Sequence, residues 1–196
     1  SKIAIIGESG VGKSTLIDIL AGFLKPTEGV VKLGGVPLTH IPLAYLVKHI
    51  TFASQSADFF DYLGIKNFGE EATEEEILKW LLKFRVKNNF TSNFQFQEFG
   101  FSFSEGEKQR LMLIRALLKK AEIYLFDEIT SALDSQIEEL VLKEIFLTLR
   151  SKTVILVTHR PAPLKFVHKI YELKDCQLTE RSDLLHQEKT SSTTPC

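Results

Sequence analysis

Cysteine is scarce in this chain of 196 residues. The two that occur, Cys176 and Cys196, have no metal-ligand spacing and are too few for a disulfide framework, so a reducing cytoplasm is the expected compartment. Long apolar runs are also missing: none approaches the roughly 20 residues that span a bilayer, and no signal peptide opens the sequence. We therefore do not expect the chain itself to span a membrane, although it can dock on one.

A strong net charge is a further absence. The formal charge is −1, so electrostatics give no reason to expect nucleic acid or an anionic membrane surface as a partner. The middle third is rich in phenylalanine, and aromatic residues interleaved with basic residues can bind single-stranded nucleic acid. Because the basic residues here are few and balanced by acidic ones, packing of the aromatic residues in the core is the favoured alternative. With 44% hydrophobic and 25% charged residues, the composition suits one globular domain.

The most informative stretch lies between two apolar runs and reads Gly7, Glu8, Ser9, Gly10, Val11, Gly12, Lys13, Ser14, Thr15. A strand, a glycine loop and a helix in this order are the setting of a phosphate-binding loop. The glycines let backbone N–H groups turn inward, and these groups attract a polyphosphate together with the helix N-terminus. Lys13 adds a charge for the β- and γ-phosphates, and the Ser14 hydroxyl can bind Mg²⁺. A glycine-rich turn without a ligand is the alternative, which the complete pattern disfavours.

Apolar strands alternate with helical patterns along the rest of the chain. Strands are expected near 3–6, 30–33, 50–53, 123–126, 153–157, 169–173 and 176–179, and helices near 13–23, 73–86, 104–118 and 135–149. This order predicts an α/β fold with a mainly parallel sheet and helices on both faces. The helix from Thr73 is expected to carry the apolar stripe Ile77, Leu78, Leu81 and Leu82. The polar segment 181–196 is expected to be a disordered, mobile tail.

Polar residues follow two of the predicted strands, and ligands of such sheets bind beyond the carboxyl ends of the strands. Asp127 is placed where a carboxylate can reach Mg²⁺, and Glu128 can act as a general base toward water. His159 ends another strand and can contact a γ-phosphate. Taken singly, a strand-end Asp often caps a turn and a lone His is more often structural. The phosphate loop favours the functional interpretation, because these strand ends should share one edge of the sheet.

In this order the motifs resemble the nucleotide-binding domain of ABC (ATP-binding cassette) transporters. The phosphate loop resembles Walker A, and Gln55 falls where the Q-loop glutamine is found. Phe103 to Arg110 resembles the start of the signature helix, and Ile123 to Glu128 resembles Walker B. Ser131 to Asp134 matches the D-loop, and His159 matches the switch histidine. Six motifs in the family's order are far more specific than any one of them.

The resemblance covers about 1–180 and implies a P-loop NTPase of the ABC ATPase type. A helical subdomain is implied at about 58–103, continued by the signature helix. Three stretches resemble the exporter branch in particular: Asp61 to Phe68, Glu98 to Gly100, and Thr130 to Ser135. The implied function is ATP binding and hydrolysis that powers transport across a membrane.

In the family, two such domains pack head to tail and hold two ATP-Mg²⁺ between Walker A of one and the signature of the other. The resemblance therefore implies a second nucleotide-binding domain as partner, in a homo- or heterodimer. It also implies a membrane-spanning transport domain, in the same polypeptide or a separate one, and a location at the cytoplasmic face of a membrane. No nucleic acid is expected.

Roles for single residues also follow from the resemblance. Lys13 holds the phosphates, while Ser14 and Asp127 hold Mg²⁺, Asp127 directly or through water. Glu128 activates the attacking water, and His159 stabilises the γ-phosphate.

The resemblance assigns the remaining roles to motifs elsewhere in the chain. Gln55 senses the metal, the water and the membrane domain, and so counts both as a metal and as a catalytic residue. Ser104 and Gly106 contact the nucleotide of the opposite subunit, and Asp134 of the D-loop belongs to the same nucleotide-binding set.

The signature departs from the family pattern at two positions. Glu107 replaces a usual glutamine, a mild change, and Glu105 replaces a glycine. A carboxylate at 105 would face phosphate oxygens, a like-charge contact that weakens closure of the two domains. Alternatively, Glu105 points to solvent and only favours the helix N-terminus. Both alternatives stay open.

The phosphate-loop strand begins almost at once, after Ser1 and Lys2, so we expect the chain to be cut from something longer. The family's first antiparallel strands and its adenine-stacking aromatic lie upstream of Walker A. Stacking on a base is worth ~1–3 kcal/mol, so without that aromatic ATP should bind weakly.

Two other functions remain open. The first is a soluble ABC ATPase clamp on DNA or ribosomes, which Glu107 and Lys108 favour slightly. The spacing from Lys13 to Phe103 leaves no room for the long coiled coil of the DNA-acting type, and the neutral charge disfavours ribosomes. The second is a nucleotide-responsive scaffold with weak turnover, against which the intact Glu128 and His159 argue.

Overall fold

The computed structural model describes residues 1–54, 68–69, 72–86 and 103–185. The chain divides into two compact units. The first unit consists of Ser1–Phe52, Ala121–Glu128 and Ser151–Cys196, and the second of Ala53–Lys120 and Ile129–Arg150. Residue Gln55, the predicted exporter stretch 98–100 and most of 61–68 lie outside the described residues.

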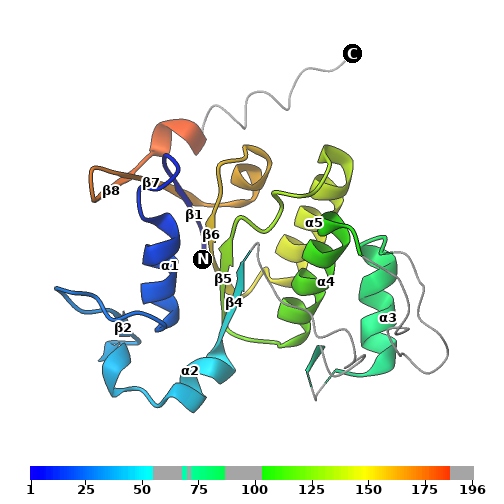
Figure 1. The fold of residues 1–196 in the computed structure, drawn as a ribbon, viewed down its shortest axis with the longest axis horizontal. Helices are drawn as coiled ribbons and strands as arrows, with labels where there is room; N and C mark the ends of the chain where they lie inside the picture. Colours follow the sequence, from blue (N-terminus) through cyan, green and yellow to red (C-terminus); the bar gives the residue numbers. More distant parts are fainter. Residues whose placement is uncertain (55–67, 70–71, 87–102, 186–196) are drawn as a thin grey trace. The chain divides into compact units, whose positions relative to one another are not determined.

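One sheet organises the first unit. Its strands are β1 (Lys2–Ile6), β4 (Ile50–Ser54), β5 (Ile123–Asp127), β6 (Thr153–Val157), β7 (Lys169–Lys174) and β8 (Gln177–Glu180). Across the described part of the chain, the strand order is β4-β5-β6-β1-β7-β8 (Figure 1). Strand β1 pairs in parallel with β6 and β7, and β5 pairs in parallel with β6, while β8 runs antiparallel to β7. The predicted mainly parallel sheet is confirmed.

The segment between β1 and β4 holds helix α1 (Lys13–Ala21), a short hairpin of β2 (Lys32–Leu33) and β3 (Val36–Pro37), and helix α2 (Leu43–His49). Helix α1 ends two residues earlier than predicted, because Gly22 adopts a left-handed φ of 81° and its N–H bonds back to the last turn. Helix α2 was not predicted from the sequence. It is only seven residues long and follows Pro42, without a polar side chain capping its start.

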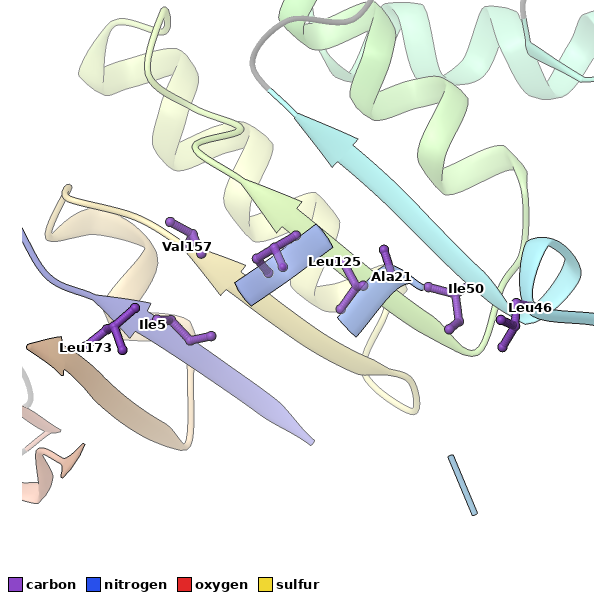
Figure 2. Close-up of a cluster of buried hydrophobic side chains, with 8 residues drawn as sticks. Ile5, Ala21, Leu46, Ile50, Leu125, Val157 and Leu173 are labelled. Atoms are coloured by element: carbon purple, nitrogen blue, oxygen red, sulfur yellow. The ribbon is translucent and has the colours of Figure 1, made fainter. Parts of the chain in front are cut away.

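The apolar core of the first unit lies between α1 and the sheet (Figure 2). It consists of Ile5, Ile17, Ala21, Leu46, Ile50, Leu125, Val157 and Leu173. Side chains of this kind each contribute about 1.5–3 kcal/mol when fully buried. Their burial fixes α1 against neighbouring strands, so the glycine loop that joins β1 to α1 is held at one end of the sheet.

The second unit holds helices α3 (Glu74–Lys83), α4 (Glu105–Leu118) and α5 (Ser135–Thr148). Helix α3 begins with a capping box between Thr73, its N-cap, and Glu76. Its buried stripe is narrower than predicted: Ile77 and Leu81 are fully buried, whereas Leu82 is 67% exposed. The reason is the helical period, because residues four apart share a face and Leu82 lies one residue further round.

Ion pairs connect the helices of the second unit. Lys83 of α3 pairs with Glu144 of α5, and Lys120, just after α4, pairs with Glu76 of α3. None of the helices that the structure describes is both long and apolar enough to cross a bilayer.

Candidate functional site

The glycine loop between β1 and α1 has a backbone that favours glycine at several positions. Gly10 and Gly12 have φ of 80° and 102°, in the left-handed region. At Gly7 the restriction is steric, because a Cβ there would lie 2.4 Å from the carbonyl oxygen of Leu173 in β7. The helix start has no side-chain cap, and Ser14 and Thr15 are exposed. The loop therefore presents an open helix N-terminus to an anion.

Lys13 is buried inside this loop, with 7% of its surface exposed. Its Nζ donates to the carbonyl oxygens of Gly7 at 2.9 Å and Glu8 at 2.7 Å. A buried ammonium needs such partners, and a phosphate oxygen is a stronger acceptor than a neutral carbonyl. Lys13 thus holds a positive charge beside the position that a polyphosphate would occupy.

Asp127 ends β5 next to the first turn of α1. Burial raises the pKa of its carboxyl group, a hydrogen bond from Ser14 opposes this, and the charges of Glu128 and Asp18 raise the pKa further. Its Oδ1 is buried without a hydrogen-bond partner in the described structure. A carboxylate oxygen without a partner beside a serine hydroxyl is a fitting donor set for Mg²⁺. The residues present therefore fit the cation that the sequence predicts.

The described residues contain no group of three or more His, Cys, Asp or Glu able to hold a metal by themselves. Mg²⁺ usually takes one or two carboxylates and completes its shell with waters and substrate phosphates.

Glu128 and His159 come from the ends of adjacent strands and meet. Glu128 follows β5 with a φ of 52°, and its N–H donates to the carbonyl of Val157 at 3.0 Å. Its Oε1 lies 3.2 Å from His159 Nδ1. A non-glycine residue with a left-handed φ, such as Glu128, costs energy, and such strain is common at functional sites. The parallel pairing of Asp127 with Val157 accounts for the meeting, because it ends both strands at the same edge.

The second unit carries the predicted signature. Ser104 caps α4: its Oγ accepts from the N–H of Glu107 at 3.3 Å, and Glu107 Oε2 accepts from the N–H of Ser104 at 3.1 Å. Glu107 is therefore one half of a capping box. Glu105 is 77% exposed at its side chain, and its Oε1 pairs with Lys108 Nζ at 2.9 Å. Both alternatives for Glu105 are compatible with this exposure, because the phosphate in question would belong to an opposite subunit.

Asp134 and Gly106 also belong to the second unit. Asp134 Oδ1 accepts from the N–H groups of Gln136 at 3.1 Å and Ile137 at 3.0 Å, so it caps α5. A Cβ at Gly106 would lie 3.0 Å from the carbonyl oxygen of Ala132. Glycine at 106 therefore permits a close approach between α4 and the loop before α5.

Gln109 lies within the stretch that resembles the signature, but the sequence predicted no role of its own for it. It is 3% exposed, its Nε2 donates to Ser131 Oγ at 3.1 Å, and its Oε1 accepts from the N–H of Ala132 at 3.0 Å. A signal was present: Gln109 shares a helical face with the buried Leu113 and Ala116, which follow it by four and seven residues. A polar residue on a buried face requires a hydrogen-bonding partner.

Comparison with known proteins agrees with this geometry. The chain is 34% identical over 190 residues to an ATP-dependent lipid A-core flippase of Chromobacterium violaceum, covering 91% of this chain and 32% of that protein. It is 32% identical to the glutathione/L-cysteine transport system ATP-binding/permease protein CydD of Haemophilus influenzae, covering 94% and 33%. The chain thus spans about a third of the length of these curated relatives.

A solved structure of a bacterial Atm1-family ABC exporter with ATP bound matches with a TM-score of 0.82 and 26% identity, over 100% of this chain and 37% of that one. The P-loop NTPase fold of the ABC ATPase type is therefore confirmed. The family model described as ABC transporter matches residues 1–131. The chain belongs to the ABC transporter family.

Proposed function

We propose that this chain binds ATP with Mg²⁺ and hydrolyses ATP to power transport across a membrane, as the nucleotide-binding domain of an exporter. One observation carries the proposal: the buried ammonium of Lys13 and the partnerless oxygen of Asp127 lie at the end of the sheet where Glu128 meets His159. The relatives' names support the transport part, because they include an ATP-dependent flippase and an exporter with ATP bound.

Most of the residues that would bind the phosphates and the metal belong to the first unit. Backbone N–H groups of the loop and the start of α1 bind phosphate oxygens, and Lys13 exchanges a loop carbonyl for a β- or γ-phosphate oxygen. Ser14 and Asp127 would hold Mg²⁺, with Gln55 as a further proposed ligand. When bound, the metal neutralises charge on the phosphate oxygens during transfer.

Glu128 and His159 divide the remaining chemistry between them. The Glu128 carboxylate accepts a proton from the attacking water. Its contact with His159 Nδ1 orients the imidazole, which leaves the other ring nitrogen for an oxygen of the γ-phosphate. Positioning and charge stabilisation of this kind carry most of the catalysis of phosphoryl transfer.

The proposal includes partners and a location. The first partner is a second nucleotide-binding domain, whose nucleotide would contact Ser104, Gly106 and Asp134 of this chain. The second is a membrane-spanning domain, which the cycle of ATP binding and hydrolysis would drive at the cytoplasmic face of a membrane. In this proposal 1–180 is the ATPase domain, with its helical subdomain at about 58–103 and a tail after it.

ATP binding and turnover of three variants test the enzymatic part. Glu128→Gln should bind ATP as the wild type does and lose turnover by at least about 100-fold, because it lacks the base. Lys13→Ala should lose binding. Lys143→Gln, which removes an exposed ion pair with Glu139, is the matched control and should change neither. Wild-type protein that does not bind ATP, or full turnover in Glu128→Gln, would contradict the proposal.

Transport needs a separate test, because a soluble clamp would also hydrolyse ATP. The natural polypeptide should cofractionate with membranes. Recovery in the soluble fraction with DNA or ribosomes would favour the clamp instead.

A further inference from the structure

Buried polar contacts tie the loop Ile129–Asp134 to two helices of the second unit. At the start of the loop, Thr130 Oγ1 donates to Glu138 Oε1 of α5 at 2.7 Å, and both residues are buried. At its end, Asp134 caps α5. These contacts hold the two ends of the loop to one helix and leave its middle to be held by α4.

Gln109 of α4 holds the middle of the loop through both the nitrogen and the oxygen of its side-chain amide. The amide nitrogen donates to Ser131 Oγ, and the amide oxygen accepts from the N–H of Ala132. One helical turn earlier, Gly106 allows α4 to approach the carbonyl of Ala132. We call these contacts of Gln109 and Gly106 with Ser131 and Ala132 the Gln109 bridge.

The Gln109 bridge joins two segments to which chemistry has been assigned. The loop follows Glu128 directly in the chain, with one peptide bond between the proposed base and Ile129. The first turn of α4 carries Ser104 and Gly106. A hydrogen bond in a buried site is stronger than one in water, so two bonds on one rigid amide hold these segments in one arrangement.

We propose that Gln109 is a positioning residue for ATP hydrolysis, which holds the loop after Glu128 and the signature turn of α4 as one body. This inference rests on the proposed function. Gln109 does not touch the nucleotide: it acts through Ser131 and Ala132. Its removal should lower kcat and leave ATP binding by the Lys13 loop unchanged, because no atom of that loop is altered.

Gln109→Leu tests the Gln109 bridge, since it introduces an apolar side chain of similar size and removes both hydrogen bonds. We expect kcat to fall by about 10- to 100-fold, the range for a misplaced catalytic group, with KM for ATP within about two-fold. Amide exchange at Ala132 should accelerate by about ten-fold, because its N–H loses its acceptor. Arg115→Gln, at an exposed position of the same helix, is the control and should change neither.

Two further variants separate positioning from mere stability. Gln109→Glu keeps an acceptor for the N–H of Ala132 and lets the Ser131 hydroxyl donate, so it should recover part of kcat. Ser131→Ala removes one bond and should lower kcat less than Gln109→Leu, and it should add little in the double variant. If Gln109→Leu does not fold, Ser131→Ala and Gln109→Glu carry the test.

The outcomes distinguish this inference from the proposed function. Unchanged kcat in Gln109→Leu, or unchanged amide exchange at Ala132, would overturn the Gln109 bridge while ATP hydrolysis stands. Equal effects on kcat and KM would also overturn it, as a general loss of structure would produce them. Wild-type protein without ATP hydrolysis would instead bring down the proposed function.

Discussion

Asp127 is a residue whose proposed role in metal binding would come at the expense of stability. Its carboxylate is half-buried, one oxygen lacks a partner, and two further acids lie near enough to raise its pKa. A group arranged in this way is unfavourable in the free protein and becomes favourable when a cation binds.

Asp127→Asn should therefore stabilise the free protein while abolishing Mg²⁺-dependent hydrolysis. Removing the unsatisfied charge should raise the free energy of unfolding by about 1 kcal/mol, which raises Tm by about 2–4 °C. We take the low end of the cost of an unsatisfied group because the residue is half exposed. The folded pKa lies above the usual 3.8, so the charge is unfavourable only at pH values above that range. The gain should be full at neutral pH and vanish as the pH falls toward 3.8. Thermal melts at several pH values check this, and a lower Tm at neutral pH would contradict it.

Glu105 is a second residue whose charge matters. Its carboxylate is exposed and paired with Lys108, at a position where the family has glycine. If this turn closes on a phosphate of the partner domain, the carboxylate repels it, and Lys108 lessens that repulsion.

Glu105→Gly and Glu105→Gln should both raise the rate of ATP hydrolysis, because each removes the charge. Lys108→Gln should have the opposite effect, since it leaves Glu105 without its cation. Glycine should also destabilise α4 by up to about 1 kcal/mol, which glutamine avoids. Steady-state ATPase rates decide: an unchanged or lower rate in both Glu105 variants would contradict the charge argument.

At the scale of elements, the hairpin β7–β8 has a turn with unfavourable residues. Asp175 and Cys176 have φ of 48° and 59°, the left-handed values of a two-residue hairpin turn. Aspartate tolerates this conformation, whereas cysteine at the second position is strained and glycine is the preferred residue.

Cys176→Gly should stabilise the protein by about 0.5–1 kcal/mol, because it relieves the left-handed strain. Asp175→Gly is the matched comparison and should give less, since aspartate already suits its position. Chemical denaturation of both variants measures the difference. A destabilised Cys176→Gly would show that the turn is not strained.

The glycine loop shows why one element can depend on another that is distant in sequence. Gly7 has no room for a Cβ because the Leu173 carbonyl of β7 lies against it. Strands β1 and β7 pair in parallel along Ile3 to Ile6, and this pairing brings the carbonyl there. The motif identifies the glycine, but the neighbouring strand supplies its steric reason.

At the scale of the whole molecule, ligand binding should appear as stability. ATP with Mg²⁺ at 100 times its Kd stabilises the folded chain by about 2.7 kcal/mol, or about 5–10 °C in Tm. Lys13→Ala should show no such shift, because its loop lacks the buried ammonium. Melting curves with and without nucleotide check this, and equal shifts in both proteins would place the nucleotide elsewhere.

The sequence predicted the order and type of most elements of the described chain, and the structure confirms them, but β3 and α2 were not predicted. It was least accurate where local signals are weak. Helix α2 lacks a polar cap, and Leu82, predicted to be part of a buried stripe, is exposed. Val30 was predicted to lie in a strand, but the observed strand β2 begins at Lys32 and Val30 is 58% exposed. In each case burial depends on neighbours that the local pattern does not contain.

What the sequence by itself determined is local: the glycine loop, the capping residues Ser104 and Asp134, and the strands and helices that alternate around them. These depend on residues within a few positions of each other, where backbone geometry and period decide the outcome. Only the tertiary structure decided that Glu128 meets His159, that Leu173 restricts Gly7, and that Gln109 bonds the loop before α5. Such contacts join residues far apart in the chain, and they arise because parallel strands and packed helices bring particular atoms into register.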